Sequence, residues 1–520
     1  MMVILSFRVE KSFYKKYGEK MSECFLGLDI GTGSSKAAIV DIEGNVLCQA
    51  SVPHKMSMPR PGWYEQDADR IWWGDFLLLC RKLIGKLQHP KESIKGVAVS
   101  TIGPCVLPID KAGKSLRPGI LYGIDTRAEK EIREIEKRLG REVIFAKTGQ
   151  DLSSQSCCPK ILWIRKNEPE VWEKTSKILT ASGFLVYKLT GRYTLDIYSA
   201  IGYAPIFDLE KRTWDPSLAG FITEMEKLPE LLWSNQVAGK LTQKAAELTG
   251  LPPGVPVVTG TTDAASEALG AGVEKTGDMM MMYGSSNFFI LKTENLRPVR
   301  SFWASNFLDP DSFVLTGGMS TVGSMFKWFG ETFPGRSVAE WENLALESSP
   351  GAGGITSLPY FAGERTPLHD PGAKGVFFGM SLSSTPGDLY RSLQEAVGYG
   401  IRHNIEEMEK ASAHADRIMA IGGATESRQL MQIITDITGC PQNLPRQKLG
   451  ACYGDAFLAA VGSNYFNSIN EINRWVRMEE AITPSETSKA IYDEGYERYR
   501  ELYNSTRHML SQPRSETGID

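Results

Sequence analysis

The amino-acid sequence predicts an α/β protein built from two related halves. Short apolar, β-branched segments such as 94–101 (IKGVAVST) and 255–259 (VPVVT) have the composition of buried strands. Segments with helical composition, such as 126–139, alternate with them, and this alternation is typical of α/β folds. A strand, a turn rich in glycine and serine, and a returning strand occur twice, at 25–41 and 279–291. This repetition indicates two halves of similar architecture.

The turn of the first repeated unit is suited to binding phosphate. Small residues let the backbone approach a phosphate, and the amides of a tight turn can hold its oxygens. Asp29, at the end of the preceding strand, could hold a magnesium ion through water. An ordinary hairpin turn is the alternative, and the spacing of a P-loop is absent.

Two later turns could complete a nucleotide site. Gly284, Ser285 and Ser286 form the tip of the second unit, and a phosphate chain could lie between two facing tips. Gly422 and Gly423 follow a strand-like stretch, and two adjacent glycines let the backbone lie flat against a nucleotide. An ordinary turn is the alternative for both.

Asp263 is the candidate catalytic residue, because it places a carboxylate directly after an apolar strand. A hydroxyl that attacks phosphorus must lose a proton, and a carboxylate within hydrogen-bond reach assists that loss. The alternative is a helix N-cap, since Asp is favoured there and 264–269 (AASEAL) has a helical composition. The two roles are compatible.

A proline and glycine cluster at 251–254 marks the expected domain boundary. We expect an N-terminal domain over 23–260 and a C-terminal domain over 261–510, with a ligand cleft between them. Residues 1–22 are expected to be a poorly ordered extension, with Met21 as an alternative start, and 511–520 a polar tail.

In the second half, three segments have helical patterns: 389–410, 427–438 and the amphipathic stretch from 485 onward.

Composition excludes several classes of protein. The formal net charge is -4, with 58 basic and 62 acidic residues, so a nucleic-acid partner is not expected. The eight cysteines form no Cys-x-x-Cys pair, which favours free buried thiols over zinc. No apolar run is long enough to span a bilayer, so we expect a cytoplasmic protein without a membrane partner. Homodimer formation is left open.

Together these motifs resemble those of the FGGY family of carbohydrate kinases, and within it the xylulokinase-like branch. The resemblance covers nearly all of the chain from Cys24 to about Tyr503. The further landmarks that carry it, in the family's order, are 62–67 (GWYEQD), 116–122 (LRPGILY), 125–127 (DTR), 159–163 (PKILW), 189–191 (LTG), 359–367 (PYFAGERTP) and 375–379 (GVFFG).

The resemblance implies two actin-like (ribonuclease H-like) ATPase domains, with ATP, magnesium and a small sugar in the interdomain cleft. It implies that Asp263 is the catalytic base and that Asp29 holds magnesium through water. The implied ATP-binding residues are Asp29, Gly31, Thr32, Gly33, Ser34, Lys36, Gly284, Ser285, Ser286, Gly422, Gly423, Ala424 and Ser427. The expected sugar contacts are Glu65, Thr101, Ile102, Gly103, Asp125 and Asp263.

Departures from the xylulokinase pattern fall on the sugar side. The chain has 101–104 (TIGP) where Gln-Met-His-Gly is usual, and Ala264 where Asn or Gln usually follows the catalytic Asp. Lost hydrogen-bond partners change substrate selection strongly, so we expect an altered sugar pocket. Three alternatives remain: a kinase for a polyol such as erythritol or glycerol or for another ketose, an actin-like ATPase or chaperone, and a sugar-binding protein with weak or no kinase activity.

Overall fold

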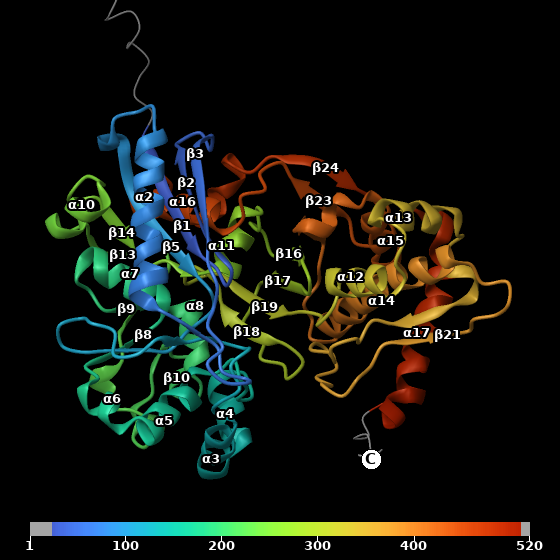
Figure 1. Ribbon diagram of the computed structural model, residues 1–520, viewed down its shortest axis with the longest axis horizontal. Helices are drawn as coiled ribbons and strands as arrows, with labels where there is room; N and C mark the ends of the chain where they lie inside the picture. Colours follow the sequence, from blue (N-terminus) through green and yellow to red (C-terminus); the bar gives the residue numbers. More distant parts are fainter. Residues whose placement is uncertain (1–22, 511–520) are drawn as a thin grey trace, which may run out of the picture.

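The computed structural model describes residues 23–510, which form two α/β units side by side (Figure 1). The expected extension over 1–22 and the tail over 511–520 lie outside the described residues. Each unit is built around one large mixed sheet. Within residues 23–510, no helix combines the length and the apolar composition that crossing a bilayer requires.

The first sheet places β1, which carries Asp29, near its centre. β1 pairs antiparallel with β2 and parallel with β5, so the carboxyl ends of β1 and β5 meet at one edge of the sheet. The strands, in spatial order, are β13 (Val237–Lys240), β14 (Pro256–Val258), β5 (Ile94–Thr101), β1 (Cys24–Ile30), β2 (Ser34–Asp41) and β3 (Val46–Pro53), with β15 (Thr261–Thr262) also paired to β5.

The second sheet repeats this arrangement. β16 pairs antiparallel with β17 and parallel with β22, as β1 does with β2 and β5. The strands, in spatial order, are β18 (Trp303–Asn306), β19 (Phe313–Gly317), β17 (Asn287–Thr293), β16 (Asp278–Tyr283), β22 (Arg417–Ile421), β23 (Gln442–Pro445) and β24 (Met478–Ile482). The expectation of two halves with one architecture is therefore confirmed.

Helices cover both sheets, and short two-stranded sheets complete the units (Figure 1). The α-helices are α2 (Gly74–Lys86), α3 (Glu129–Leu139), α4 (Arg141–Thr148), α5 (Cys157–Asn167), α6 (Pro169–Lys174), α7 (Ala181–Thr190), α8 (Ile197–Ala200), α9 (Pro216–Ala219), α10 (Gln243–Thr249), α11 (Asp263–Gly270), α12 (Gly323–Thr332), α13 (Val338–Glu347), α14 (Pro386–Lys410), α15 (Arg428–Thr438), α16 (Ala451–Gly462) and α17 (Lys489–Leu510). The remaining strands are β4 (Glu65–Gln66), β6 (Leu107–Ile109), β7 (Gly119–Ile120), β8 (Lys177–Leu179), β9 (Thr194–Asp196), β10 (Phe207–Asp208), β11 (Thr213–Trp214), β12 (Glu230–Leu232), β20 (Thr356–Leu358) and β21 (Val376–Phe378).

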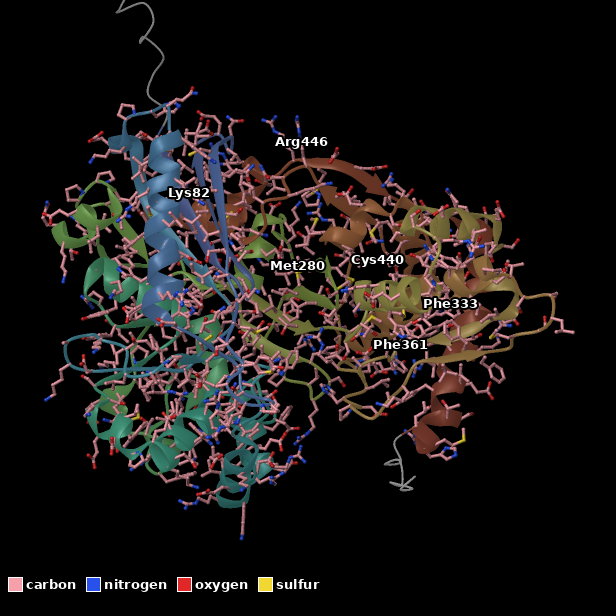
Figure 2. All side chains as sticks on the ribbon, in the orientation of Figure 1. Lys82, Met280, Phe333, Phe361, Cys440 and Arg446 are labelled. Atoms are coloured by element: carbon pink, nitrogen blue, oxygen red, sulfur yellow. The ribbon has the colours of Figure 1, made fainter. Side chains whose placement is uncertain are left out.

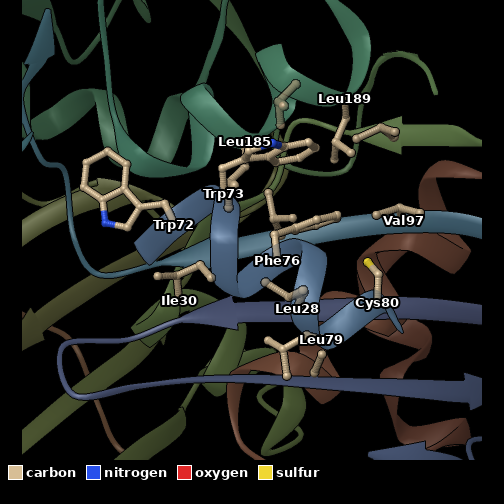
Figure 3. Packing of buried hydrophobic residues seen from close by; sticks show 14 of the residues in the cluster. Leu28, Ile30, Trp72, Trp73, Phe76, Leu79, Cys80, Val97, Leu185 and Leu189 are labelled. Carbon is tan, nitrogen blue, oxygen red and sulfur yellow. The ribbon is translucent and has the colours of Figure 1, made fainter. Parts of the chain in front are cut away.

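Alternation along the strands gives each sheet two buried faces. Leu28 and Ile30 of β1 pack with Phe76 of α2 on the outer face, in a core that also contains Leu185 of α7 (Figure 3). Phe25 faces the opposite way, into a core shared with α11 and α16. Asp29 has the same parity as Phe25, so it belongs to the face that meets the second unit.

The run of four methionines in β16 divides in the same way. Met279 and Met281 pack in the core that contains α12, α14 and α15. Met280 packs with α11 and α16 and lies between the two units (Figure 2). A strand buried on both faces accounts for a continuous apolar run in this place.

Two glycines allow α16 to lie between the sheet and α11, although it comes late in the chain. A β-carbon on Gly27 of β1 would lie 1.9 Å from the carbonyl oxygen of Cys452, and one on Gly454 would lie 1.9 Å from that of Ser266. Both approaches are possible only without side chains. Helix α16 belongs to the expected C-terminal domain in sequence, yet it packs on the sheet of the first unit. The domain boundary expected at residue 260 therefore stays a prediction.

The expected helices are present, with small differences at their starts. The helix expected over 126–139 begins at Glu129, and the one expected from 485 begins at Lys489 after a short 3-10 turn. Those expected from 389 and 427 begin at Pro386 and Arg428. All eight cysteines are buried and free, as expected.

Candidate active site

Side chains from outside the first hairpin hold its tip in place. Nε2 of Gln66 donates to the carbonyl oxygen of Thr32 at 3.1 Å. Nε2 of His54 lies 3.0 Å from the carbonyl oxygen of Gly31, and Nδ1 of the same ring lies 2.8 Å from Oδ2 of Asp75. With these carbonyls fixed from behind, Thr32 and Gly33 stay exposed at the tip.

Asp29 belongs to a buried carboxylate network at the carboxyl ends of β1 and β5. The Ser100 hydroxyl donates to Oδ2 of Asp455 at 2.7 Å and lies 3.3 Å from Oδ1 of Asp29. Ser266 of α11 donates to the other oxygen of Asp455. Burial, followed by the charges of Asp263, Asp455 and Glu267, raises the pKa of Asp29 well above its usual range.

The second hairpin tip rests on the start of α12. The carbonyl oxygen of Ser285 accepts hydrogen bonds from the amides of Val322 at 2.9 Å and Ser324 at 3.0 Å. The Ser324 hydroxyl donates to the same oxygen. Ser285 itself is exposed at the tip.

A cavity of about 260 Å³, here called the Asp263 cavity, opens between the two units. Asp263 begins α11, and Thr262 is the N-cap, so the interpretation of Asp263 as the capping residue is wrong. Oδ1 of Asp263 accepts from the amide of Ala264 at 2.8 Å, and burial raises the pKa of Asp263 to about 6. The lining residues are Gly103, Pro104, Tyr122, Gln150, Gln155, Tyr198, Ser199, Ile201, Gly202, Thr262, Asp263, Ala264, Glu267, Met282, Ser286, Phe288, Trp303, Thr316 and Arg365.

A second cavity of about 280 Å³, here called the Gly422 cavity, lies next to it. Gly422 has a φ of +96°, and a β-carbon there would lie 2.6 Å from the carbonyl oxygen of Tyr283, so only glycine fits. Lys36 and Gly423 also line this cavity, whereas Ala424 and Ser427 do not. The hydroxyl of Ser427 instead caps α15 by accepting from the amide of Leu430.

Of the expected sugar contacts, Asp263 and Gly103 line the Asp263 cavity. Thr101 and Ile102 are buried beside it but are not part of its lining.

Glu65 and Asp125 lie in an ion-pair network instead. Nη2 of Arg127 pairs with Asp125 at 2.7 Å, and its Nη1 pairs with Glu65 at 2.8 Å. Arg117 pairs with Glu65 as well. Arg117 and Arg127 thus neutralise the two carboxylates, as buried charges require.

Sequence reasoning did not assign several residues of the cavity wall. Tyr122 and Arg365 lie within the family landmarks 116–122 and 359–367, but the sequence analysis assigned neither residue a role in the site. Gln150, Gln155 and Trp303 belong to no motif, so no local signal could have found them.

The environment of Asp29 fits a magnesium ion. Among residues 23–510, Ser100 is the hydrogen-bond donor to Oδ1 of Asp29 and Oδ2 has no partner, although the residue is only 9% exposed. Within the same residues, no three His, Cys, Asp or Glu side chains are grouped to hold a metal alone. An ion here would therefore share its coordination with phosphate oxygens and water, as magnesium usually does.

Two sheets of matching topology, with cavities between them, define an actin-like (ribonuclease H-like) two-domain fold. Comparison with known proteins gives the family. The model of the FGGY carbohydrate-kinase N-terminal domain matches residues 24–270, and that of the C-terminal domain matches residues 279–463. The chain therefore belongs to the FGGY family of carbohydrate kinases and is a sugar kinase by class.

Individual relatives cover almost the whole chain. A xylulose kinase from Staphylococcus xylosus is 26% identical over 92% of this chain and 99% of its own. An L-xylulose/3-keto-L-gulonate kinase from Escherichia coli is 27% identical over 93% of this chain and 97% of its own. The crystal structure of a xylulose kinase from Rhodospirillum rubrum is 30% identical, with a TM-score of 0.88 over 94% of this chain and 100% of that one.

Proposed function

We propose that this protein transfers the γ-phosphoryl group of ATP to a hydroxyl of xylulose or another small ketose, with Asp263 as the general base. The position of Asp263 carries the proposal. Its carboxylate lies in the wall of a cavity large enough for a small sugar, beside a second cavity formed by a glycine turn.

The nucleotide would occupy the Gly422 cavity, with its phosphates directed between the two hairpin tips. Lys36 in the cavity wall is a suitable partner for phosphate oxygens. The backbone amides of Thr32, Gly33 and Ser285, the exposed residues of the two tips, are suited to the same oxygens. The proposed ATP-binding residues are Asp29, Gly31, Thr32, Gly33, Ser34, Lys36, Gly284, Ser285, Ser286, Gly422, Gly423, Ala424 and Ser427.

The chemistry proposed for Asp263 is proton transfer. The acceptor hydroxyl attacks the γ-phosphorus, its proton passes to Asp263, and the bond from phosphorus to the β–γ bridging oxygen breaks to release ADP. With a pKa of about 6, Asp263 is ionised at neutral pH and close enough to neutrality to be an effective base.

Asp29 would hold a magnesium ion through water. That ion would neutralise charge on the phosphates, and the free Oδ2 of Asp29 is the acceptor available to an aquated cation.

The acceptor is proposed from the relatives and from the cavity wall. The relatives are described as kinases of xylulose, of L-xylulose and of 3-keto-L-gulonate. Pro104 and Ala264 leave fewer polar groups beside Asp263 than the xylulokinase pattern, while Gln155 supplies an amide from another part of the wall. Gln150, whose Nε2 donates to the carbonyl oxygen of Ile201, lines the same part. We therefore propose selection among ketoses that differs from that of a typical xylulokinase.

A substrate-binding role stays a prediction for four residues: Glu65, Thr101, Ile102 and Asp125. Their positions outside the cavity lining support a role in positioning the residues that form the wall. The carboxylate of Asp125 accepts from the amide of Tyr64, and Thr101 and Ile102 lead into Gly103.

An acceptor panel tests the proposal. ADP release is measured with D-xylulose, L-xylulose, other pentuloses and hexuloses, glycerol and erythritol. We expect ADP formation that depends on a ketose. ADP formation that is equal without any acceptor would indicate an ATPase, and sugar binding without ADP would indicate a sugar-binding protein. Turnover only with glycerol or erythritol would replace the ketose with a polyol.

Homodimer formation, also still a prediction, is measured in parallel by light scattering.

A further inference from the structure

Glu267 lies where the two cavities meet. Among residues 23–510, it is the one residue that lines both the Asp263 cavity and the Gly422 cavity. It follows Asp263 by four positions in α11, so the two carboxylates project from the same face of the helix, one turn apart. Under the proposed function, a phosphoryl group transferred from the nucleotide to the sugar would pass this junction.

The carboxylate of Glu267 has no protein partner at this junction. Neither of its oxygens forms a hydrogen bond or an ion pair among the described residues. Burial and the charge of Asp263 raise the pKa of Glu267 to about 7, and the charge of Lys36 opposes that rise. Glu267 is only partly exposed, and a carboxylate in such a place without a protein partner is costly to the free protein, which indicates that its partner is a ligand.

Backbone geometry keeps room for this carboxylate. A β-carbon on Gly450, just before α16, would lie 3.0 Å from Oε1 of Glu267, and Gly450 has a φ of +71°. Gly450 also lines the Gly422 cavity. Oε1 is thereby located at the wall of the cavity proposed for the nucleotide.

The nature of the ligand follows from charge. A carboxylate directed at phosphates without a cation would repel them. Carboxylate oxygens are the ligands that magnesium prefers, and magnesium in nucleotide sites is usually held by one or two carboxylates with phosphates and water. The charge of Glu267 acts on Asp29, which has a free oxygen of its own.

We propose that Glu267 acts together with Asp29 to hold the divalent cation of the bound nucleotide. The proposal rests on the proposed function, because it requires a nucleotide in the Gly422 cavity. It also explains why nucleotide binding would depend on a cation: without metal, the phosphates would face the unpaired negative charge of Glu267.

The test compares metal and nucleotide binding by the whole protein, without turnover. Mn²⁺ replaces Mg²⁺, and free Mn²⁺ is measured by electron paramagnetic resonance in the presence of ADP. ADP affinity is measured separately by calorimetry, once with Mn²⁺ and once in excess EDTA. The variants are E267Q, E267D and the control E247Q, which removes a carboxylate from the exposed surface of α10.

We expect E267Q to weaken Mn²⁺ binding to the ADP complex by about 10- to 100-fold, as for other groups that support a metal. The same variant should bind ADP in EDTA as tightly as the wild type or more tightly, because a repulsion is removed. E267D should retain part of the Mn²⁺ affinity, and E247Q all of it. A purely structural role would not produce opposite effects with and without metal.

The outcomes separate this proposal from the proposed function. If the wild type binds ADP with Mn²⁺ and E267Q does the same with equal affinity, the role of Glu267 is overturned and the proposed function stands. If the wild type binds no ADP under either condition, the proposed function itself fails. Melting temperatures establish that each variant is folded; because Glu267 has no partner, E267Q should melt no lower than the wild type.

Discussion

The Ser100 hydroxyl donates to the buried carboxyl of Asp455 at 2.7 Å, across the contact between β5 and α16. Burial raises the pKa of Asp455 to about 8, so this carboxyl carries a proton at neutral pH. Once protonated, it can donate to Ser100, whose own proton is then free for Asp29, 3.3 Å away. The protonation state of one residue on α16 thus bears on the proposed magnesium-binding carboxylate.

Asp455→Asn should stabilise the protein increasingly as pH rises from about 4 to about 8. The folded state holds the Asp455 proton up to about pH 8, whereas the unfolded chain releases it near its ordinary value of 3.8. Rising pH in this window therefore favours unfolding of the wild type, and an amide, which does not titrate, lacks this effect. Melting temperatures of both proteins at pH 5.5, 7.0 and 8.5 measure the difference. A difference that does not change with pH would show that Asp455 is already ionised in the folded protein.

Turnover should fall on the acid side of about pH 6. Asp263 must be ionised to accept a proton, and its pKa is raised to about 6. As pH falls through this value the base becomes protonated, and kcat/KM should drop by about tenfold per pH unit. A profile that is flat from pH 7 to pH 5, with folding verified by circular dichroism, would argue against Asp263 as the base.

The repeated hairpins and most helices could be predicted, because local patterns specify them. Tips of glycine and serine, apolar strands and the Asp263 strand end are each contained within a few residues. By contrast, the partner of a buried carboxylate is not specified by the residues next to it in the sequence. Glu65 lies in a family landmark, yet it pairs with Arg117 and Arg127, far along the chain. Whether it meets substrate or arginine is decided by tertiary packing alone.

The same limit applies to the cavity wall. Trp303 and Gln155 come from different units and meet only after the chain has folded. Glu267 lies in a stretch of helical composition, and nothing in that stretch indicates that its side chain reaches two cavities. Only the position of α11 between the sheets shows this.

Gln66→Met should weaken nucleotide binding more than sugar binding. Methionine has similar length but cannot donate to the carbonyl of Thr32, which Gln66 holds from behind the first tip. We expect the KM for ATP to rise roughly two- to twelvefold, equivalent to the ~0.5–1.5 kcal/mol of a typical hydrogen bond. The matched control is Gln243→Met on the surface of α10. An effect on the KM for sugar alone would show that the first tip does not serve the nucleotide.

Asp125→Ala should mainly destabilise the fold. The ion pair of Asp125 with Arg127 has both side chains fully buried, so removing the carboxylate leaves the guanidinium with one partner fewer in a dry site. Loss of one partner of a buried pair typically costs about 3–5 kcal/mol. Chemical denaturation measures this loss. Unchanged stability with a raised KM for sugar would instead make Asp125 a direct substrate contact.

The central claim is that Asp263 activates a sugar hydroxyl against the terminal phosphate of ATP. Following the label from γ-³²P-ATP in the presence of D-xylulose and related ketoses, for the wild type and Asp263→Asn, tests it most directly. We predict that the wild type places the label on sugar, and that Asp263→Asn, still folded and still binding ADP, does so roughly 100 to 10,000 times more slowly. Label released as inorganic phosphate at a rate independent of sugar, or a variant as fast as the wild type, would contradict the account.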